Sequence, residues 1–121
     1  MKKEKLSDMK REMLSTADKI KYVQDTLYVI SGKWKLPILM AMYEGVSRFR
    51  DLQRAVPVIT TRVLSKELKE LEANQLIVRT VFDTYPVSIE YTLTSYSYSL
   101  TPVVDEMIDW GRKHRKRVTR G

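Results

Sequence analysis

Residues Arg48 to Thr94 read RFRDLQRAVPVITTRVLSKELKELEANQLIVRTVFDTYPVSIEYTLT. The pattern predicts two short helices joined by a tight turn, followed at once by two strands joined by a short loop. The rest of the chain is interpreted in relation to this segment.

The second helix is predicted over 60–73 and begins at Thr60, whose hydroxyl can accept a hydrogen bond from a free amide of the first turn. Ile59 then precedes the cap and Leu64 lies at the fourth helical position, the two sites of a hydrophobic staple. At about 100° per residue, three leucines share an arc of about 60°, and three cations share another on the opposite side. The leucines are Leu64, Leu68 and Leu71, and the cations are Arg62, Lys66 and Lys69.

The neighbouring segments complete the arrangement. Pro57 stops the preceding helix, which offers Phe49 and Leu52 for packing and turns three arginines outward. Strands are predicted over 76–82 and 89–93, with turn residues at 83–86. A two-stranded hairpin is marginal alone, so it must lean on the helices. The fold class is therefore α+β, mainly α: a winged helix-turn-helix with a two-stranded β-wing, in which one helix enters the major groove of DNA.

The cationic side of the second helix has two interpretations. A row of Lys and Arg opposite leucines is often only a solvated face, and the nearby Glu67, Glu70 and Glu72 favour that interpretation. The surrounding helix-turn-helix and wing favour contact with DNA instead.

More amphipathic helix is predicted than a winged-helix core of this size needs, with one helix before and one after the motif. We expect these terminal helices to pair across a two-fold axis and form a homodimer; the alternative is that they fold back on their own core. The expected interface residues are Leu6, Met9, Met13, Val103, Met107 and Trp110.

Composition limits the remaining possibilities. The 121 residues predict one domain over 1–111, followed by a basic tail over 112–121. The net charge is +7, but the tail holds six of the 22 Lys and Arg, which leaves 16 basic against 15 acidic residues. We expect a flexible tail that contacts phosphates or aids solubility. Without cysteine, a signal peptide or a membrane span in the sequence, we expect a soluble cytoplasmic protein.

An ordered set of residues resembles the HxlR-type family of bacterial winged helix-turn-helix transcriptional regulators, relatives in architecture of the MarR type. The resemblance runs from about Ile20 to Trp110. It rests on Gly32-Lys33-Trp34 before an apolar helix, Arg48-Phe49-x-x-Leu52, Leu64 to Glu72, Leu76-Ile77-x-Arg79, Tyr85-Pro86, Glu90-Tyr91-x-Leu93-Thr94, and Leu100-x-Pro102 with Trp110.

The resemblance implies a homodimer that reads a palindromic operator in double-stranded DNA, with the helix Thr60–Ala73 in the major groove and the wing along the minor groove. Carried over by position, the residues that would meet bases or nearby phosphates are Thr60, Thr61, Arg62, Ser65, Lys66 and Lys69. Those that would lie near the DNA backbone are Lys33, Arg48, Arg50 and Arg79, and the wing would contribute Thr84 and Tyr85.

The chain departs from the family pattern at several positions. Lys21 stands where many members have a sensing cysteine, so sensing by thiol chemistry is not expected, and no effector is indicated. Gln75 replaces the glycine before the first wing strand and is expected to strain the backbone in the left-handed region. From Thr80 to Ser99 there is no Lys or Arg, so the wing is expected to contribute little charge.

Other function classes have weaker support. An enzyme is not expected, because His114 is the only histidine and no metal cluster or phosphate loop is present; no cofactor is predicted. RNA binding lacks an aromatic stacking platform on a sheet. The alternative that stays open is a winged-helix protein–protein interaction module with only non-specific affinity for nucleic acid.

Overall fold

The computed structural model describes residue 8, residue 11 and residues 13–120, and the chain divides into two compact units, 1–31 and 32–121. Two of the expected interface residues, Leu6 and Met9, lie outside the described residues. No helix in the described part of the chain is long and apolar enough to cross a membrane. The expected domain boundaries, 1–111 and 112–121, stay a prediction.

The first unit contains α2 (Thr16–Ile30). Ser15 caps it by accepting a hydrogen bond at 3.1 Å from the backbone N–H of Asp18, so the helix starts at Thr16. The apolar side chains of Ile20, Val23 and Leu27 are more than half exposed.

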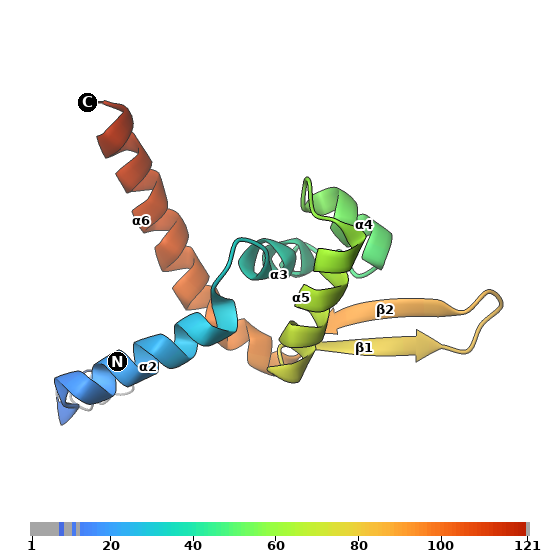
Figure 1. Cartoon of the computed structure of the whole chain (residues 1–121), viewed down its shortest axis with the longest axis horizontal. Helices are drawn as coiled ribbons and strands as arrows, with labels where there is room; N and C mark the ends of the chain where they lie inside the picture. Colours follow the sequence, from blue (N-terminus) through green and yellow to red (C-terminus); the bar gives the residue numbers. More distant parts are fainter. Residues whose placement is uncertain (1–7, 9–10, 12, 121) are drawn as a thin grey trace. The chain divides into compact units, whose positions relative to one another are not determined.

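The second unit is a winged helix-turn-helix, which confirms the predicted fold (Figure 1). Three helices gather at the base of the hairpin, and the hairpin loop projects away from them. The elements are α3 (Lys35–Tyr43), α4 (Phe49–Ala55), α5 (Thr61–Ala73), β1 (Ile77–Phe82), β2 (Ser88–Leu93), the 3-10 helix η1 (Ser95–Leu100) and α6 (Thr101–Thr119). Its fully buried apolar side chains are Ile38, Leu39, Leu52, Leu64, Leu68, Leu71, Leu76 and Ile77.

The wing is an antiparallel pair in which Ile77 faces Leu93 and Phe82 faces Ser88. Strand β2 is joined to the loop between α3 and α4 by a backbone hydrogen bond, in which the N–H of Tyr91 donates to the carbonyl of Ser47 at 2.8 Å. Both strands lie within one residue of their predicted starts. The loop between the strands includes the fully exposed Tyr85, so part of it is accessible to a partner.

Helix α6 packs lightly and continues further than expected. Val104 is its one buried residue in the described part of the chain. The preceding helix η1 is joined to α3 by Tyr43, whose hydroxyl donates to the carbonyl of Ser97 at 2.7 Å. The helix runs through 112–119, so the segment predicted as a separate tail continues α6, and its flexibility stays a prediction. The carboxylate of Asp109 forms ion pairs with Lys113 at 3.0 Å and with Arg112 at 3.2 Å. These pairs span the expected boundary after residue 111 and favour a continuous helix there.

Candidate nucleic-acid interface

The turn between α4 and α5 is braced from both sides. Val58 has a φ of 70°, a strained conformation for a β-branched residue, and its side chain points into solvent. The side-chain amide of Gln53 donates to the carbonyl of Ile59 at 3.4 Å and to the hydroxyl of Thr61 at 3.1 Å. Val56 and Ile59, on either side of Val58, are buried, so the turn is anchored in the core at both ends.

Helix α5 has the two faces that its sequence predicts. The N–H of Val63 donates to the Thr60 hydroxyl at 3.2 Å, which confirms the cap. Each predicted core leucine is buried, and Ile59 and Leu64 are both buried at the staple positions. The opposite side exposes the three predicted cations, together with Thr60 and Thr61, while Ser65 is half-buried.

The cations of α5 differ in their partners. Lys66 lies 3.9 Å from a carboxylate oxygen of Glu70, one turn further along the helix. Within the described residues, neither Arg62 nor Lys69 forms an ion pair. These two charges are therefore the more available ones for an external anion.

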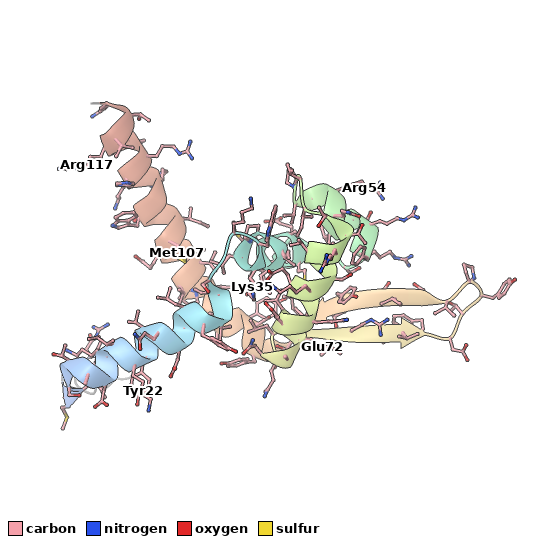
Figure 2. The ribbon with its side chains drawn as sticks, viewed as in Figure 1. Tyr22, Lys35, Arg54, Glu72, Met107 and Arg117 are labelled. Atoms are coloured by element: carbon pink, nitrogen blue, oxygen red, sulfur yellow. The ribbon has the colours of Figure 1, made fainter. Side chains whose placement is uncertain are left out.

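A recess of about 600 Å³ lies between α4 and the hairpin loop. It brings together the predicted residues Arg48, Arg50, Thr84 and Tyr85, and it adds Arg54, which sequence reasoning did not place at the site. Figure 2 shows the side chain of Arg54 extending outward from α4. Its position four residues after Arg50, on the same side of the helix, was the available signal. The recess thus supplies cations beside a wing whose own loop has none.

The acids around this recess neutralise only part of its charge. Arg54 pairs with Asp51 at 3.1 Å, and Arg48 lies 3.6 Å from Glu90 of β2. At the loop, the Thr84 hydroxyl donates to the carbonyl of Pro86 at 2.8 Å, and Tyr85 is fully exposed. The aromatic ring at the tip of the wing is therefore free to meet a surface.

Two further residues predicted to lie near the DNA backbone, Lys33 and Arg79, lie elsewhere in the second unit. The ammonium of Lys33 lies 4.7 Å from the centre of the Trp34 ring, a cation–π contact that leaves the lysine exposed at the start of α3. Arg79 is exposed on β1, and its backbone N–H donates to the Glu72 carboxylate at 3.2 Å. Both side chains are accessible, but neither lines the recess between α4 and the wing.

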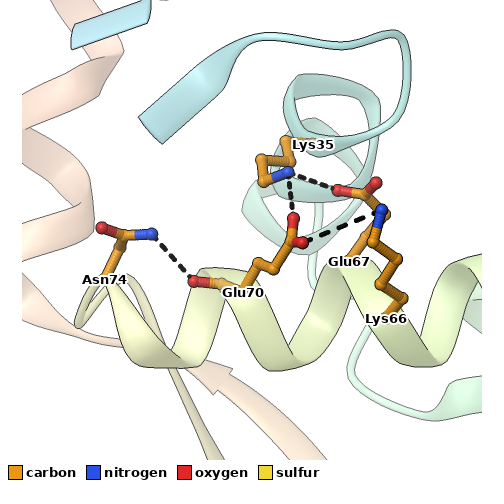
Figure 3. A network of polar contacts seen from close by, with 5 residues as sticks. All are labelled: Lys35, Lys66, Glu67, Glu70 and Asn74. Atoms are coloured by element: carbon orange, nitrogen blue, oxygen red, sulfur yellow. Dashed lines mark hydrogen bonds and ion pairs between the residues drawn. The ribbon is translucent and has the colours of Figure 1, made fainter. Parts of the chain in front are cut away.

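Sequence reasoning missed a buried ion cluster that joins α3 to α5. Lys35 donates to the carboxylate of Glu67 at 2.7 Å and also to Glu70 (Figure 3). Both Lys35 and Glu67 are only 8% exposed, so Glu67 is not part of a solvated face. Burial alone would lower the pKa of Lys35, but the hydrogen bonds to Glu67 and Glu70 outweigh it and raise that pKa. The Lys35 hydrogen bond in turn lowers the pKa of Glu70.

Comparison with known proteins identifies the family. The family described as HxlR-like helix-turn-helix matches residues 29–119, which include every element of the second unit. The chain belongs to this family.

Curated relatives and solved structures agree with the assignment. The Bacillus subtilis (strain 168) protein named as HTH-type transcriptional regulator YdeP is 40% identical over 96 residues, 79% of this chain and 75% of the relative. A Methanothermobacter thermautotrophicus regulator is 39% identical over 85 residues, 70% and 65% of the two chains. The structure titled "Redoxregulator HypR in its reduced form" has a TM-score of 0.75 at 38% identity and covers 82% of this chain and 98% of that chain.

This HxlR-type chain is therefore a transcriptional regulator with a helix-turn-helix DNA-binding fold. Its departures from the family pattern are also visible. Gln75 has a φ of 64°, as its replacement of a glycine predicts, and the hydroxyl of Thr94 donates to its carbonyl at 2.7 Å. No group of acidic or histidine side chains in the described ranges is arranged to hold a metal ion.

The expected dimer residues of this HxlR-type regulator remain untested as an interface. Val103, Met107 and Trp110 are exposed on α6 and line an apolar recess of about 650 Å³ with Pro102 and Glu106. Met13 is 83% exposed and belongs to the other unit. Figure 2 marks Met107 on the first half of α6 and Arg117 near its end.

Proposed function

We propose that this regulator is a sequence-specific double-stranded DNA-binding protein that acts as a homodimer on a palindromic operator, with α5 in the major groove. The observation that carries the proposal is the division of α5 into a fully buried leucine side and an exposed cationic side behind a capped N-terminus. A helix braced in this way presents its N-terminal residues to base edges.

The proposed contacts divide by chemistry. Thr60, Thr61, Arg62, Ser65 and Lys66 meet bases or nearby phosphates from the first turns of α5. Lys69 contacts phosphates, and so do the four cations predicted to lie near the DNA backbone, which are Lys33, Arg48, Arg50 and Arg79. Thr84 and Tyr85 approach the DNA from the wing, and the α4 arginines that line the recess supply the charge that the wing lacks.

The homodimer part of the proposal rests on the exposed face of α6. An apolar recess lined by Val103, Met107 and Trp110 is costly to leave in water, and a second copy of the same surface would cover it. Two copies related by a two-fold axis also match a palindrome, because each reading helix then faces one half-site.

Selection of bound sequences from a random duplex pool tests the function directly. We expect enrichment of a palindrome with half-site centres about one helical turn apart, or a multiple of it. The enriched duplex should bind at least about a thousandfold more tightly than a scrambled duplex in fluorescence anisotropy titrations. Equal affinity for the two duplexes would leave only non-specific electrostatic binding and would contradict the proposal.

Replacement of Met107 by glutamate should shift the assembly towards monomer, because it places a charge in an apolar recess that the proposed partner covers. We expect the dimer dissociation constant, measured by sedimentation equilibrium, to rise by at least about tenfold, on the order of 1.4 kcal/mol. Thr119→Glu near the end of the same helix is the matched control and should leave it unchanged. A wild-type mass that stays monomeric at all concentrations would refute the dimer.

Redox regulation, which the name of one solved relative states, cannot act through a thiol of the present sequence. The solved relatives include structures titled as reduced forms of HypR and of YodB from B. subtilis, the latter with a TM-score of 0.68 at 28% identity. The present sequence contains no cysteine, so a thiol within these residues cannot carry a redox signal.

A further inference from the structure

Lys35 is the only lysine or arginine side chain buried within the described residues, and its two acceptors lie on the helix proposed to read DNA. Figure 3 shows its ammonium between the carboxylates of Glu67 and Glu70, on the side of α5 that faces α3. The cluster therefore joins the start of α3 to the middle of α5 through charges rather than through apolar packing alone.

The same cluster determines how Glu70 is shared between two lysines. One carboxylate oxygen of Glu70 accepts a hydrogen bond from Lys35, and the other lies 3.9 Å from the ammonium of Lys66, beyond hydrogen-bond distance. Lys66 precedes Glu70 by four residues, the weaker order for an ion pair on a helix. Lys35 is thus the stronger partner of Glu70, and Lys66 keeps a 70% exposed side chain.

Removing Lys35 would change this sharing. The Glu70 side chain is 42% exposed, so it has room to turn towards Lys66 and form a close ion pair with it. Such a pair would neutralise one of the three cations on the exposed side of α5. Glu67 would lose its cation as well, and nothing charged would then tie α5 to α3.

We propose that Lys35 is a positioning residue for DNA recognition: it draws the carboxylates of Glu67 and Glu70 towards α3 and so leaves the ammonium of Lys66 available for DNA. This inference rests on the proposed function of α5. It assigns to a buried residue, which is not itself among the proposed DNA contacts, a role in setting which charges α5 presents.

The test compares a double and a triple variant that both lack the buried pair. Lys35→Met/Glu67→Met replaces the pair by apolar side chains, which avoids leaving an unpaired buried charge. The triple variant adds Glu70→Gln, which removes the carboxylate that could capture Lys66. The measured quantity is the preference ratio, defined as the Kd for a scrambled duplex divided by the Kd for the duplex enriched from the random pool.

The preference ratio of the double variant is expected to fall about tenfold, the size of one lost base-reading contact. The triple variant should return to within about threefold of wild type, because Lys66 is free again. Glu70→Gln in the wild-type chain is the control: it removes one negative charge, strengthens binding to both duplexes and leaves the ratio within about twofold. Thermal melting of each variant ensures that titrations use folded protein.

Three outcomes distinguish support for the role of Lys35, failure of this inference alone, and failure of the proposed function as well. Recovery in the triple variant supports the role of Lys35, because a purely structural loss would not be reversed by changing the half-buried Glu70. Equal ratios in the double and triple variants, with a wild-type ratio far above one, would overturn this inference alone. A wild-type ratio near one would overturn both the inference and the proposed function.

Discussion

Replacing Lys35 alone by methionine is expected to lower the free energy of unfolding by about 3–5 kcal/mol. The substitution leaves Glu67 buried beside α3 without its cation, and an isolated buried charge is costly. The companion change Glu67→Met removes that charge, so the double variant should regain stability to within about 1 kcal/mol of wild type. Urea denaturation at neutral pH measures both values.

The neighbouring lysine provides the matched control. Lys33 is exposed, and its ammonium lies over the Trp34 ring without an ion pair to any described residue, so Lys33→Met should cost no more than about 1 kcal/mol. Equal losses for Lys33→Met and Lys35→Met would show that the buried cluster contributes no more than a surface charge.

The stability difference between wild type and Lys35→Met should depend on pH in a direction set by two pKa shifts. The raised pKa of Lys35 means that its stabilising effect is complete below the ordinary value of 10.5 and is lost as the pH rises through the folded-state pKa. The lowered pKa of Glu70 means that its effect is present above 4.5 and is lost as the pH falls through the folded-state pKa. The difference in free energy of unfolding between wild type and Lys35→Met should therefore become smaller at both high and low pH.

Replacing Arg62, Lys66 and Lys69 together by alanine is expected to weaken binding to the enriched duplex by at least about a hundredfold. Each phosphate contact that is lost should also flatten the plot of log affinity against log salt by about 0.9. The three side chains are exposed on the side of α5 away from its leucines, so the fold should be retained. Anisotropy titrations at several salt concentrations measure both effects.

A second triple replacement controls for net charge. Arg115, Lys116 and Arg117 are equally cationic and exposed, but they lie near the end of α6. Their replacement by alanine should lower affinity for enriched and scrambled duplexes alike and preserve the preference between them. If the two triple variants lost the same preference, α5 would not be the reading helix.

Local rules account for the parts of the fold that the sequence predicted. The Thr60 cap, the staple position of Leu64 and the leucine side of α5 depend on residues within one or two turns of each other, and all are present. The strained backbone at Gln75 was predictable for a similar reason, because one missing glycine defines it. The assignment of these elements to DNA contact stays a prediction at the level of single residues.

The buried cluster escaped prediction because its members are far apart in the chain. Lys35 and Glu67 are 32 residues apart, and only the packing of α3 against α5 brings them together. A signal was nevertheless present: Glu67 lies about 40° from Leu71 around the helix, at the margin of its buried side. Lys35 is likewise the one charged residue in the predominantly apolar α3.

The helical state of the basic segment was missed for a different reason. Its charge predicted a separate tail, but the residues after Gly111 can form a helix, and Asp109 supports them through two ion pairs. The recess that groups Arg54 with Tyr85 could not be predicted either, since it depends on the placement of the wing relative to α4.

The last two turns of α6 have a consequence for cooperativity. Every residue from Gly111 to Arg120 is exposed, so no packing against the described part of the chain holds this stretch in the helical state. Like charges lie four residues apart, as in Arg112 with Lys116 and Lys113 with Arg117, and they repel. The end of the helix is therefore governed by a helix–coil equilibrium that salt or a bound polyanion shifts towards order, which makes its length a property of the surroundings as well as of the sequence.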